Sequence, residues 1–529
     1  MMKIMKQPSF ASCFKSMALV FGIGLALASC ANEDIAQNQK GKDNDANLTT
    51  FSTGDPTTRT SMESNGTFYW ESGDKIWVKD DNGAWQQSSN APTEKTASFE
   101  FKVPGKFTKS NTYKVYYPGK NGNQDQVSIV ANQSQAEPNT TAHFGTAGDC
   151  GMADAAWSNA KNGFAFTLDH KAAYLLFLPR TANTILHDCY LTKIEVNSDN
   201  DITSTYTLNP TTGELTGTGT GKQIVVSTRG NGTYANGFPL TNSATSAATN
   251  GAYVVVKPGV HTLKIRYWVK DIATGIEGTI TKTLPSALYD QNKYYNITAN
   301  LDVKDYGGDR YYMWDAQQNY WSGHEWNTAN PWQPVLNRQS NSNYAQNNSD
   351  PRYYNESYPG LGISNPATHA SCKDLPNANE MSWYVMYGDS RWDGDELWTT
   401  MGHLYKGGMW LKKKSVLQNE GHYNTAFSAD GVTDLRTTWA DKYNGSSSII
   451  SGVPSAADAG NYFYLPALGV YNSGQLNHVG YIGTGFYWSS SATPSQRYGN
   501  YAYSLVFGYG YVYVSSFNRN NGFRAEALQ

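Results

Sequence analysis

Charged residues are scarce in this sequence, and neither sign dominates. Of its 529 residues only 16% are Asp, Glu, Lys or Arg, and 41 basic against 44 acidic side chains give a formal net charge of −3. Soluble domains of ordinary composition have about 25% charged residues. Because a chain without a positive field cannot gather nucleic acid through bulk electrostatics, the composition predicts no nucleic-acid partner.

Cysteine is also scarce, and the histidines are scattered. The five cysteines, Cys13, Cys30, Cys150, Cys189 and Cys372, form no CxxC pair, and none of the 9 histidines stands in an HExxH motif. The sequence therefore predicts no metal site, no cofactor and no catalytic residue. Cys150 and Cys189 either form a disulfide or stay as two unpaired buried thiols, and the sequence leaves both open.

Aromatic side chains are abundant: 13% of the residues are Phe, Trp or Tyr, including 37 Tyr and 15 Trp. So much apolar area excludes a disordered chain, because such a chain lacks groups that can be buried. At roughly 150 residues per domain, the length allows about three folded domains.

The first thirty residues have the pattern of an export signal. A basic start precedes an apolar stretch at residues 17–27, which is too short to span a bilayer as a mature helix. The stretch ends in Leu-Ala-Ser-Cys30, which resembles the lipobox of bacterial lipoproteins. The resemblance implies a signal peptide at residues 1–29 and a lipid such as palmitate on Cys30; an ordinary signal peptide with an incidental cysteine is the alternative. Residues 30–58 are polar and predict a tether.

Residues 59–303 have the pattern of antiparallel strands. β-Branched and aromatic runs occur at residues 173–178, 253–256 and 263–269, and the last alternates apolar with polar side chains. Clusters of Gly, Pro, Asn and Asp separate such runs at a spacing that suits hairpins. We predict two antiparallel β-sandwiches, the first at residues 59–175 and the second at 176–303.

Four segments of this region together resemble the fimbrillin family of Bacteroidota surface lipoproteins. They are TRTS at 58–61, FYWESGDKIWV at 68–78, FAFTLDHKAAYL at 164–175 and YYNITANL at 294–301. The resemblance implies transthyretin-like sandwiches, an outer-membrane lipoprotein, and pilus assembly with other pilin subunits by donor-strand exchange after proteolysis at an arginine. Arg59 matches that arginine; a solvated loop arginine that stays uncut is the alternative. Removal of one strand would expose an edge that an incoming strand can complete.

Residues 304–529 differ in composition and are predicted to form a separate α+β head domain. They contain 10 of the 15 Trp and 24 of the 37 Tyr. The segments YWSSS, AYSLVF and NNGFRA near the end resemble the C-type-lectin-like, major paralogous (FISUMP) domains of Bacteroidota surface proteins. The resemblance implies a ligand-binding head, which retroelements diversify in some relatives of the fold. The calcium-ligand patterns of calcium-dependent lectins are not evident.

Two helices are predicted in the head. The segment PNANE predicts a helix after Asn377, with Glu380 completing a capping box. Leu397, Met401 and Leu404 have the spacing of a second helix that ends at the two glycines that follow.

Four acidic residues, Asp389, Asp393, Asp395 and Glu396, stand just before the second predicted helix. A hard cation accepts such oxygens, but the spacing is not that of an EF-hand. Because carboxylates are favoured near the positive end of a helix dipole, we predict helix capping here and no metal.

The segment FGYGYVYV at 507–514 predicts one strand with Phe507, Tyr509, Tyr511 and Tyr513 on the same face. Tyrosines give rigid amphipathic area, and nearby Ser and Asn add hydrogen bonds, the mixture found in antibody paratopes. A cross-strand aromatic ladder that only stabilises the sheet is the alternative. The candidate ligand-binding residues are Tyr498, Tyr501, Tyr503, Tyr509, Tyr511, Tyr513, Asn518, Asn520 and Asn521.

Taken together, the sequence predicts a mostly β surface adhesin, not an enzyme, with a fimbrillin-like stalk and a C-type-lectin-like head that binds a glycan or protein. We expect a pilus-tip subunit, because a head at the C-terminal end leaves no free terminal strand to donate. The first alternative is a lipid-anchored receptor outside any pilus, with a variable and retroelement-diversified ligand site. The second is a carbohydrate-active enzyme, since the separation of a carboxylate pair cannot be read from sequence.

Overall fold

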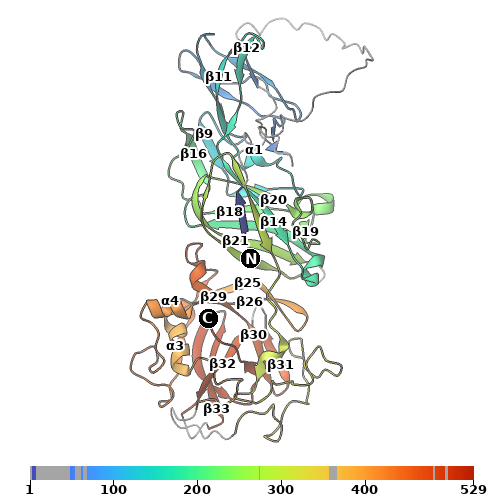
Figure 1. Cartoon of the computed structure of the whole chain (residues 1–529), viewed down its shortest axis with the longest axis vertical. Coiled ribbons are helices and arrows are strands. Elements are labelled where there is room, and N and C mark those ends of the chain that lie inside the picture. Colours follow the sequence, from blue (N-terminus) through green and yellow to red (C-terminus); the bar gives the residue numbers. More distant parts are fainter. Residues whose placement is uncertain are drawn as a thin grey trace, which may run out of the picture. The chain divides into compact units, whose positions relative to one another are not determined.

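A computed structural model describes residues 3–6, 48–53, 61–62, 68–272, 275–356, 366–480, 483–494 and 499–529. The described chain consists mostly of β-strands, so the predicted fold class is confirmed at that level (Figure 1). Three predicted features, the lipobox with Cys30, the cleavage residue Arg59 and the candidate ligand residue Tyr498, lie outside the described residues.

The chain divides into two compact units. The N-terminal unit comprises Met1–Tyr267 and Leu284–Leu301, and the C-terminal unit comprises Trp268–Thr283 and Asp302–Gln529. Two long strands, β21 (Gly259–Asp271) and β22 (Glu277–Tyr289), contribute residues to both units.

One sheet of the N-terminal unit contains a strand from the segment predicted to be a tether. Strand β2 (Leu48–Thr53) lies between β7 (Glu100–Pro104), to which it is antiparallel, and β12 (Gly163–Phe166), to which it is parallel. Phe51 of β2 is fully buried. The tether prediction is therefore wrong for residues 48–53, because one large apolar side chain anchors a segment of polar average composition.

The other strands of this sheet, which pair outward from β12, are β11 (Gly151–Ser158), β8 (Tyr113–Tyr117), β5 (Trp77–Lys79) and β6 (Trp85–Gln87), with β13 (Asp169–His170) on β11. A separate ribbon pairs β3 (Ser61–Met62) with β4 (Phe68–Tyr69).

Three further groups of strands complete the N-terminal unit. The first is β1 (Lys3–Lys6), β23 (Lys293–Asn300), β14 (Ala173–Arg180) and β20 (Ala252–Val256). The second is β10 (Asn132–Ser134), β18 (Gln223–Ser227), β15 (Cys189–Ser198) and β21, with β19 (Phe238–Pro239) on β15. The third is β17 (Leu215–Thr216), β16 (Ser204–Leu208) and β9 (Gln126–Ile129). The predicted strands at 173–178, 253–256 and 263–269 are confirmed as parts of β14, β20 and β21.

The strand pairing does not follow the predicted division at residue 175. Strand β9 pairs with β16, and β10 pairs with β18, so residues 126–134 belong to sheets made mainly from the later half of the unit. The described part of the unit also contains two short helices, α1 (Phe144–Ala147) and α2 (Ala247–Asn250), and neither marks a boundary between the groups of strands. A strand from one half of the sequence that pairs with strands from the other half leaves no signal in composition, so the division could not be located from the sequence.

The side-chain amides of two buried glutamines form hydrogen bonds with the backbone of one edge of β20, in the place that a neighbouring strand would occupy. The Gln133 amide donates to the carbonyl of Val255 at 2.8 Å and accepts from its N–H at 3.0 Å. The Gln135 amide likewise accepts from the N–H of Tyr253 at 2.7 Å and donates to the carbonyl of Gly251 at 2.9 Å. Because buried backbone groups must find partners, these side chains satisfy an edge that would otherwise be costly to bury.

The C-terminal unit is built on two sheets. The larger consists of β24 (Tyr311–Tyr312), β35 (Phe523–Arg524), β32 (Gly485–Ala492), β33 (Tyr501–Gly508), β34 (Tyr511–Asn518) and β27 (Lys442–Asn444), with β30 (Leu468–Asn472) and β31 (Gln475–Val479) attached. The smaller consists of the tip of β22, β25 (Arg391–Thr400), β26 (His403–Lys412) and β29 (Tyr462–Pro466), with β28 (Ile450–Ser451) on β25. Helices α3 (Ala378–Tyr387) and α4 (Lys414–Asn419) accompany them.

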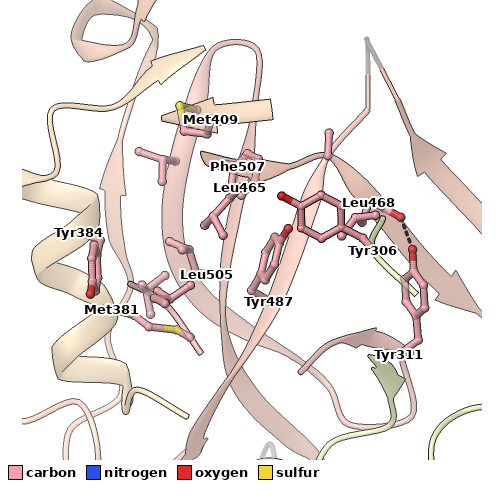
Figure 2. Close-up of a cluster of buried hydrophobic side chains, with 14 of the residues drawn as sticks. Tyr306, Tyr311, Met381, Tyr384, Met409, Leu465, Leu468, Tyr487, Leu505 and Phe507 are labelled. Atoms are coloured by element: carbon pink, nitrogen blue, oxygen red, sulfur yellow. Dashed lines mark hydrogen bonds between the residues drawn. The ribbon is translucent and has the colours of Figure 1, made fainter. Parts of the chain in front are cut away.

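A single aromatic-rich core joins α3 to both sheets of the C-terminal unit. Met381 and Tyr384 of α3 face Leu505 and Phe507 of β33, and Tyr487 of β32 lies beside them (Figure 2). All five side chains are fully buried. Burial of a side chain of this size stabilises the fold by about 1.5–3 kcal/mol, so this core fixes α3 and the hairpin that follows β32.

The first predicted helix of the head is confirmed, and the second is wrong. Asn377 and Glu380 form the predicted capping box at the start of α3, with hydrogen bonds of 3.0 and 2.8 Å. Leu397, Met401 and Leu404 instead belong to the β25–β26 hairpin. Its turn is Met401-Gly402, both with positive φ (49° and 77°), the conformation of a type I′ turn. Methionine is an unusual first residue for such a turn, so the sequence contains no clear turn signal here. Without that signal, the apolar spacing suggested a helix.

Candidate functional site

The segment predicted to be one tyrosine-bearing strand is a hairpin. Strands β33 and β34 pair antiparallel with Gly508 opposite Tyr511, and Tyr509 lies in the turn between them with 72% of its surface exposed. The single-strand prediction for residues 507–514 is therefore wrong. Gly508 leaves room for this reversal, because a Cβ there would lie 2.7 Å from the ring of Tyr511, and the continuous alternating pattern concealed the turn.

The hairpin separates the predicted ligand residues between its two faces. Tyr503 and Phe507 point to the core that contains α3, where Tyr503 is fully buried and its hydroxyl donates to the carbonyl of Ala440 at 3.2 Å. Tyr501 is opposite Asn518 on that same face. Since directly opposed residues of an antiparallel pair share a face, Tyr511 and Tyr513 point to the other side. Tyr503 is a core residue, and we leave it out of the site.

Three partly exposed tyrosines, Tyr443, Tyr513 and Tyr511, line up on the outer face; we call them the tyrosine row. Tyr443 of β27 stands directly opposite Tyr513 of β34, with ring centroids 6.0 Å apart and planes 33° apart. The rings of Tyr511 and Tyr513 are 5.6 Å and 31° apart. Tyr443 has 61% of its surface exposed, while the other two rings are partly buried. The row is thus a shallow platform and not a closed pocket.

The row is the exposed continuation of a buried aromatic cluster. The ring of Phe517 stacks on Tyr513 with centroids 6.3 Å apart. The ring centroid of Phe517 lies 6.0 Å from that of Phe486 and 5.4 Å from that of Phe523, and the rings of Phe486 and Phe523 are 4.8 Å apart. Phe523 and Trp488 are buried there. Packing at that end fixes the rotamers of the row without covering it.

Tyr513 of the row is neutral at physiological pH. Burial and the neighbouring Tyr511 raise the pKa of Tyr513 to about 12. The hydroxyl of Tyr511 forms a hydrogen bond of 3.0 Å with the hydroxyl of Thr484. Neutral phenols both donate and accept hydrogen bonds, so the platform offers apolar faces and polar edges at once.

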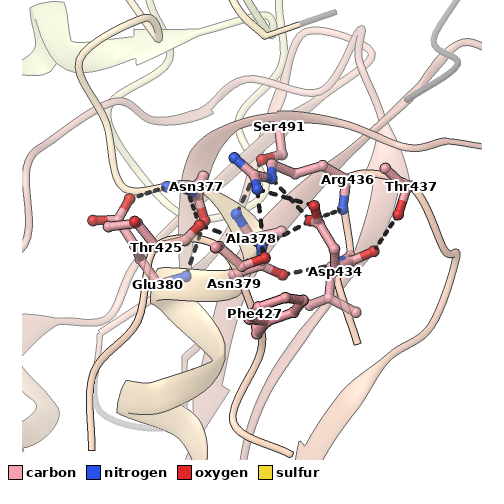
Figure 3. A network of polar contacts seen from close by, with 12 residues as sticks. Asn377, Ala378, Asn379, Glu380, Thr425, Phe427, Asp434, Arg436, Thr437 and Ser491 are labelled. Carbon is pink, nitrogen blue, oxygen red and sulfur yellow. Dashed lines mark hydrogen bonds and ion pairs between the residues drawn. The ribbon is translucent and has the colours of Figure 1, made fainter. Parts of the chain in front are cut away.

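Strand β27, which carries Tyr443, follows a loop that α3 holds in place. Asn379 of α3 donates to Asp434 at 2.8 Å and to the carbonyl of Ala426 at 2.9 Å, and it accepts from the N–H of Leu435 at 2.8 Å. The Arg436 guanidinium donates two hydrogen bonds, of 2.8 and 2.9 Å, to the same Asp434 carboxylate (Figure 3). Asn379 is fully buried, so this network is a structural anchor for the loop.

The predicted asparagines are not part of the row. Asn518 ends β34 at the opposite end from Tyr509, and Asn520 and Asn521 follow it in a turn. At about 3.3 Å per residue the strand puts them roughly 20 Å from the turn at Tyr509. Conversely, sequence reasoning missed Tyr443, because a three-residue edge strand inside a long polar loop has no alternating pattern to reveal it.

The four acidic residues near Asp389 neither cap a helix nor form a cation site; the capping prediction is wrong, since they precede and form β25. Asp393 accepts from the Trp410 indole at 3.1 Å, and Asp389 accepts from Tyr462 at 2.6 Å and from Arg391 at 2.7 Å. Lys406 donates to Asp395 at 3.3 Å.

Glu396 attaches the tip of β22 to β25. Its carboxylate accepts from the backbone N–H of Thr281 at 2.9 Å and from the hydroxyls of Thr279 and Thr281 at 3.0 and 2.6 Å. Each of these acids therefore has a structural partner inside the C-terminal unit.

The described cysteines are buried thiols. Cys150, Cys189 and Cys372 form no disulfide with one another, so the disulfide alternative for Cys150 and Cys189 is not adopted. Burial raises the pKa of Cys372 to about 12, and its sulfur accepts from the N–H of Asp315 at 3.3 Å. Within the described ranges no group of three or more His, Cys, Asp or Glu residues could hold a metal ion, and no helix is long and apolar enough to cross a membrane.

Comparisons with known proteins return solved structures of low similarity. No family model matches the chain, and no curated protein matches it. A candidate cell adhesion protein from Bacteroides ovatus is similar at 14% identity over 48% of this chain and 93% of that chain, with a TM-score of 0.31.

Two fimbrial structures are also similar. The fimbrial anchor protein Mfa2 from Porphyromonas gingivalis matches at 12% identity over 45% of this chain and 83% of its own, with a TM-score of 0.22. A fimbrial protein from Bacteroides ovatus matches at 10% identity over 90% and 98%, with a TM-score of 0.25. Because these TM-scores are low, the function proposed next rests on the residues of this chain and their geometry.

Proposed function

We propose that the protein is a cell-surface adhesin whose C-terminal unit binds its ligand on the tyrosine row. The observation that carries this proposal is that three hydroxyl-bearing rings, the first of them 61% exposed and the other two partly exposed, lie side by side on one face of the sheet. Folding alone does not explain why the three rings stay exposed. On the same face of the sheet, Phe486 and Phe517 pack against a buried cluster. Tyrosine is also enriched at protein recognition surfaces, where it supplies contact area at a low entropic cost.

The adhesin proposal is tested by displaying the full chain on beads and counting beads that stay on epithelial cells and on mucin. The double variant Tyr443→Ala/Tyr513→Ala should lose at least tenfold in retained beads. The control is Tyr387→Ala, which removes a tyrosine of α3 that is 38% exposed and lies outside the row. Equal retention of all three folded proteins would reject the proposal.

A lipid on Cys30 is proposed as the anchor to the outer membrane. The support is the sequence alone: an apolar stretch that ends in Leu-Ala-Ser-Cys30. Metabolic labelling with palmitate should mark the wild-type chain and not Cys30→Ala, and fractionation should place the label in the outer membrane. Labelling of Cys30→Ala would contradict the assignment.

Assembly with other pilin subunits by donor-strand exchange is proposed for the N-terminal unit, and the position of β2 supports it. Strand β2 is an interior strand that pairs on both sides, and only six residues lie between its end at Thr53 and the start of the segment after Arg59. Cleavage at Arg59 would leave β2 attached by non-covalent contacts alone. Its loss would expose the edges of β7 and β12 and the seat of Phe51, which an incoming strand could fill.

The exchange is tested with purified protein and an arginine-specific protease. After cleavage, a labelled peptide copy of β2 should replace the resident strand, whereas Arg59→Ala protein should take up none. A peptide in which Phe51 is replaced by Ala is the matched control and should exchange poorly. Failure of cleaved protein to take up the β2 peptide would reject strand exchange.

A pilus-tip position is proposed because the last strand of the head is not available for donation. Strand β35 pairs with β24 and β32, and Arg524 within it is fully buried. Immunogold labelling should therefore mark one end of each pilus, and labelling along the shaft would contradict a tip role. The alternative is a lipid-anchored receptor outside any pilus, whose variable residues would be seen as adenine-restricted codon changes among close strains.

A further inference from the structure

We infer that the ligand of the tyrosine row is a neutral glycan; the inference rests on the adhesin function proposed above. Neither the fold nor the proposed function requires this ligand class. Three observations carry it: the lack of charge around the row, the spacing of its rings, and the polar edge of each ring.

Charge is almost absent from the chain that builds the row. From Tyr443 to Gln529 there are five charged residues, Asp458, Arg497, Arg519, Arg524 and Glu526. Two of these, Arg519 and Arg524, are fully buried. The carboxylate of Asp441 lies close enough to the row for its negative charge to contribute to the raised pKa of Tyr513. Among the described residues of this segment, phosphate, sulfate and sialic acid groups would meet a carboxylate and no accessible cation, so an anionic ligand is disfavoured.

The single carboxylate is also a poor match for a basic protein. Protein interfaces that use charge do so through complementary patches, and the 443–529 segment offers only scattered charges. The side chain of the neighbouring Lys442 is already paired with Asp430 at 2.6 Å. Recognition by the row must therefore depend on ring stacking and on hydrogen bonds between neutral groups.

The spacing of the rings suits a chain of sugar units. Successive centroids are 5.6 and 6.0 Å apart, and the planes differ by 31° and 33°, so the three rings present a gently twisted, almost continuous surface. A pyranose has a flat face of C–H groups that can stack on such a ring, and hydroxyls around its rim that can bond to phenol oxygens. Because the platform is shallow, affinity must build up over several sugar units.

Each ring of the row is held in place before binding. Cross-strand pairing fixes Tyr443 against Tyr513, and Thr484 holds the hydroxyl of Tyr511. Little rotamer freedom is then lost on stacking, which favours binding of a weakly interacting neutral ligand.

The test uses the full chain and mucin from which sialic acid and sulfate have both been removed, so that the remaining O-glycans are neutral, in a surface-binding assay at low and high salt. Wild-type protein should bind, and the binding should change less than twofold between 0.05 and 0.5 M NaCl, since no ion pair is involved. Periodate oxidation of the mucin, which cleaves sugar diols, should abolish binding, whereas proteolysis of the mucin backbone should leave glycopeptide binding intact.

Variants locate the site and separate the two proposals. Tyr513→Ala should weaken binding to this mucin at least tenfold. Tyr443→Ala, at an exposed position on the edge strand where the side chain is not part of the core, should do so severalfold, and Tyr387→Ala should not. If the row variants abolish cell adhesion but adhesion survives periodate and is lost on protease treatment of the cells, the adhesin function stands and the glycan inference is overturned. If folded row variants adhere and bind mucin as the wild type does, both fail.

Discussion

Phe51 is predicted to be the residue that keeps β2 in its sheet. Its side chain is fully buried and its ring lies 5.1 Å from Phe107 and 5.0 Å from Phe164, with Tyr113 at 6.5 Å. The other side chains of β2 are polar or lie at its partly buried start. Replacement of Phe51 by alanine therefore removes nearly all of the apolar contact that the strand makes.

The expected loss can be built from its parts. Transfer of the ring from the core to water costs about 1.5–3 kcal/mol. The two close ring pairs add about 0.5–1.5 kcal/mol each, and part of the cavity remains open, so Phe51→Ala should cost about 3–5 kcal/mol in total. Thr49→Ala, at a partly exposed position of the same strand, should cost less than about 1 kcal/mol.

Hydrogen exchange followed by mass spectrometry measures this loss at the neighbouring strands. In the full chain, Phe51→Ala should speed exchange of the amides in β7 and β12 by roughly 10²–10⁴-fold, because each 1.4 kcal/mol is about a factor of ten. Thr49→Ala should leave these amides within about tenfold of wild type. Unchanged protection of β7 and β12 in Phe51→Ala would refute the view that this side chain anchors β2. It would also contradict the expected poor exchange of the β2 peptide in which Phe51 is replaced by Ala.

Three further predictions concern stability. Gln135→Leu should destabilise the N-terminal unit by about 1–3 kcal/mol in urea unfolding, because it removes the hydrogen-bond partner of the buried N–H of Tyr253, and a loss below about 0.5 kcal/mol would contradict it. Asn379→Leu should likewise raise hydrogen exchange in the 425–437 loop while leaving β32 protected; equal exchange in both would contradict the anchor role. Burial lowers the pKa of His143 to about 4, so the unfolded state binds the proton first as the pH falls. The contribution of His143 to stability should be constant above pH 6.5 and fall by about 3 kcal/mol towards pH 4. His143→Gln should flatten that window, and an unchanged slope would contradict the assignment.

Local patterns in the sequence predicted local structure well. The capping box of α3 needs only Asn377 and Glu380 at the correct spacing, and β14 and β20 need only a run of β-branched and aromatic residues. These elements are determined by residues that are neighbours in the chain, so a pattern of a few residues was enough.

Features that depend on distant residues were missed or misassigned. Strand β2 is a strand because Phe164 and Phe107, more than fifty residues away, complete its core, and its own composition resembles a linker. Met401-Gly402 forms a turn because both residues take positive φ, and the same apolar spacing is compatible with a helix. Tyr443 joins the tyrosine row only through the register of β27 with β34, which no pattern in the loop indicates.

The central claim is that the tyrosine row touches the ligand, and hydroxyl-radical footprinting tests it most directly. The full chain is oxidised free and while bound to mucin-coated or cell-coated beads, and the oxidation of each tyrosine is read by mass spectrometry. Binding should lower the oxidation of Tyr443 and Tyr513 severalfold and leave Tyr387 unchanged. Equal oxidation of Tyr443 and Tyr513 in the free and bound protein would contradict the claim.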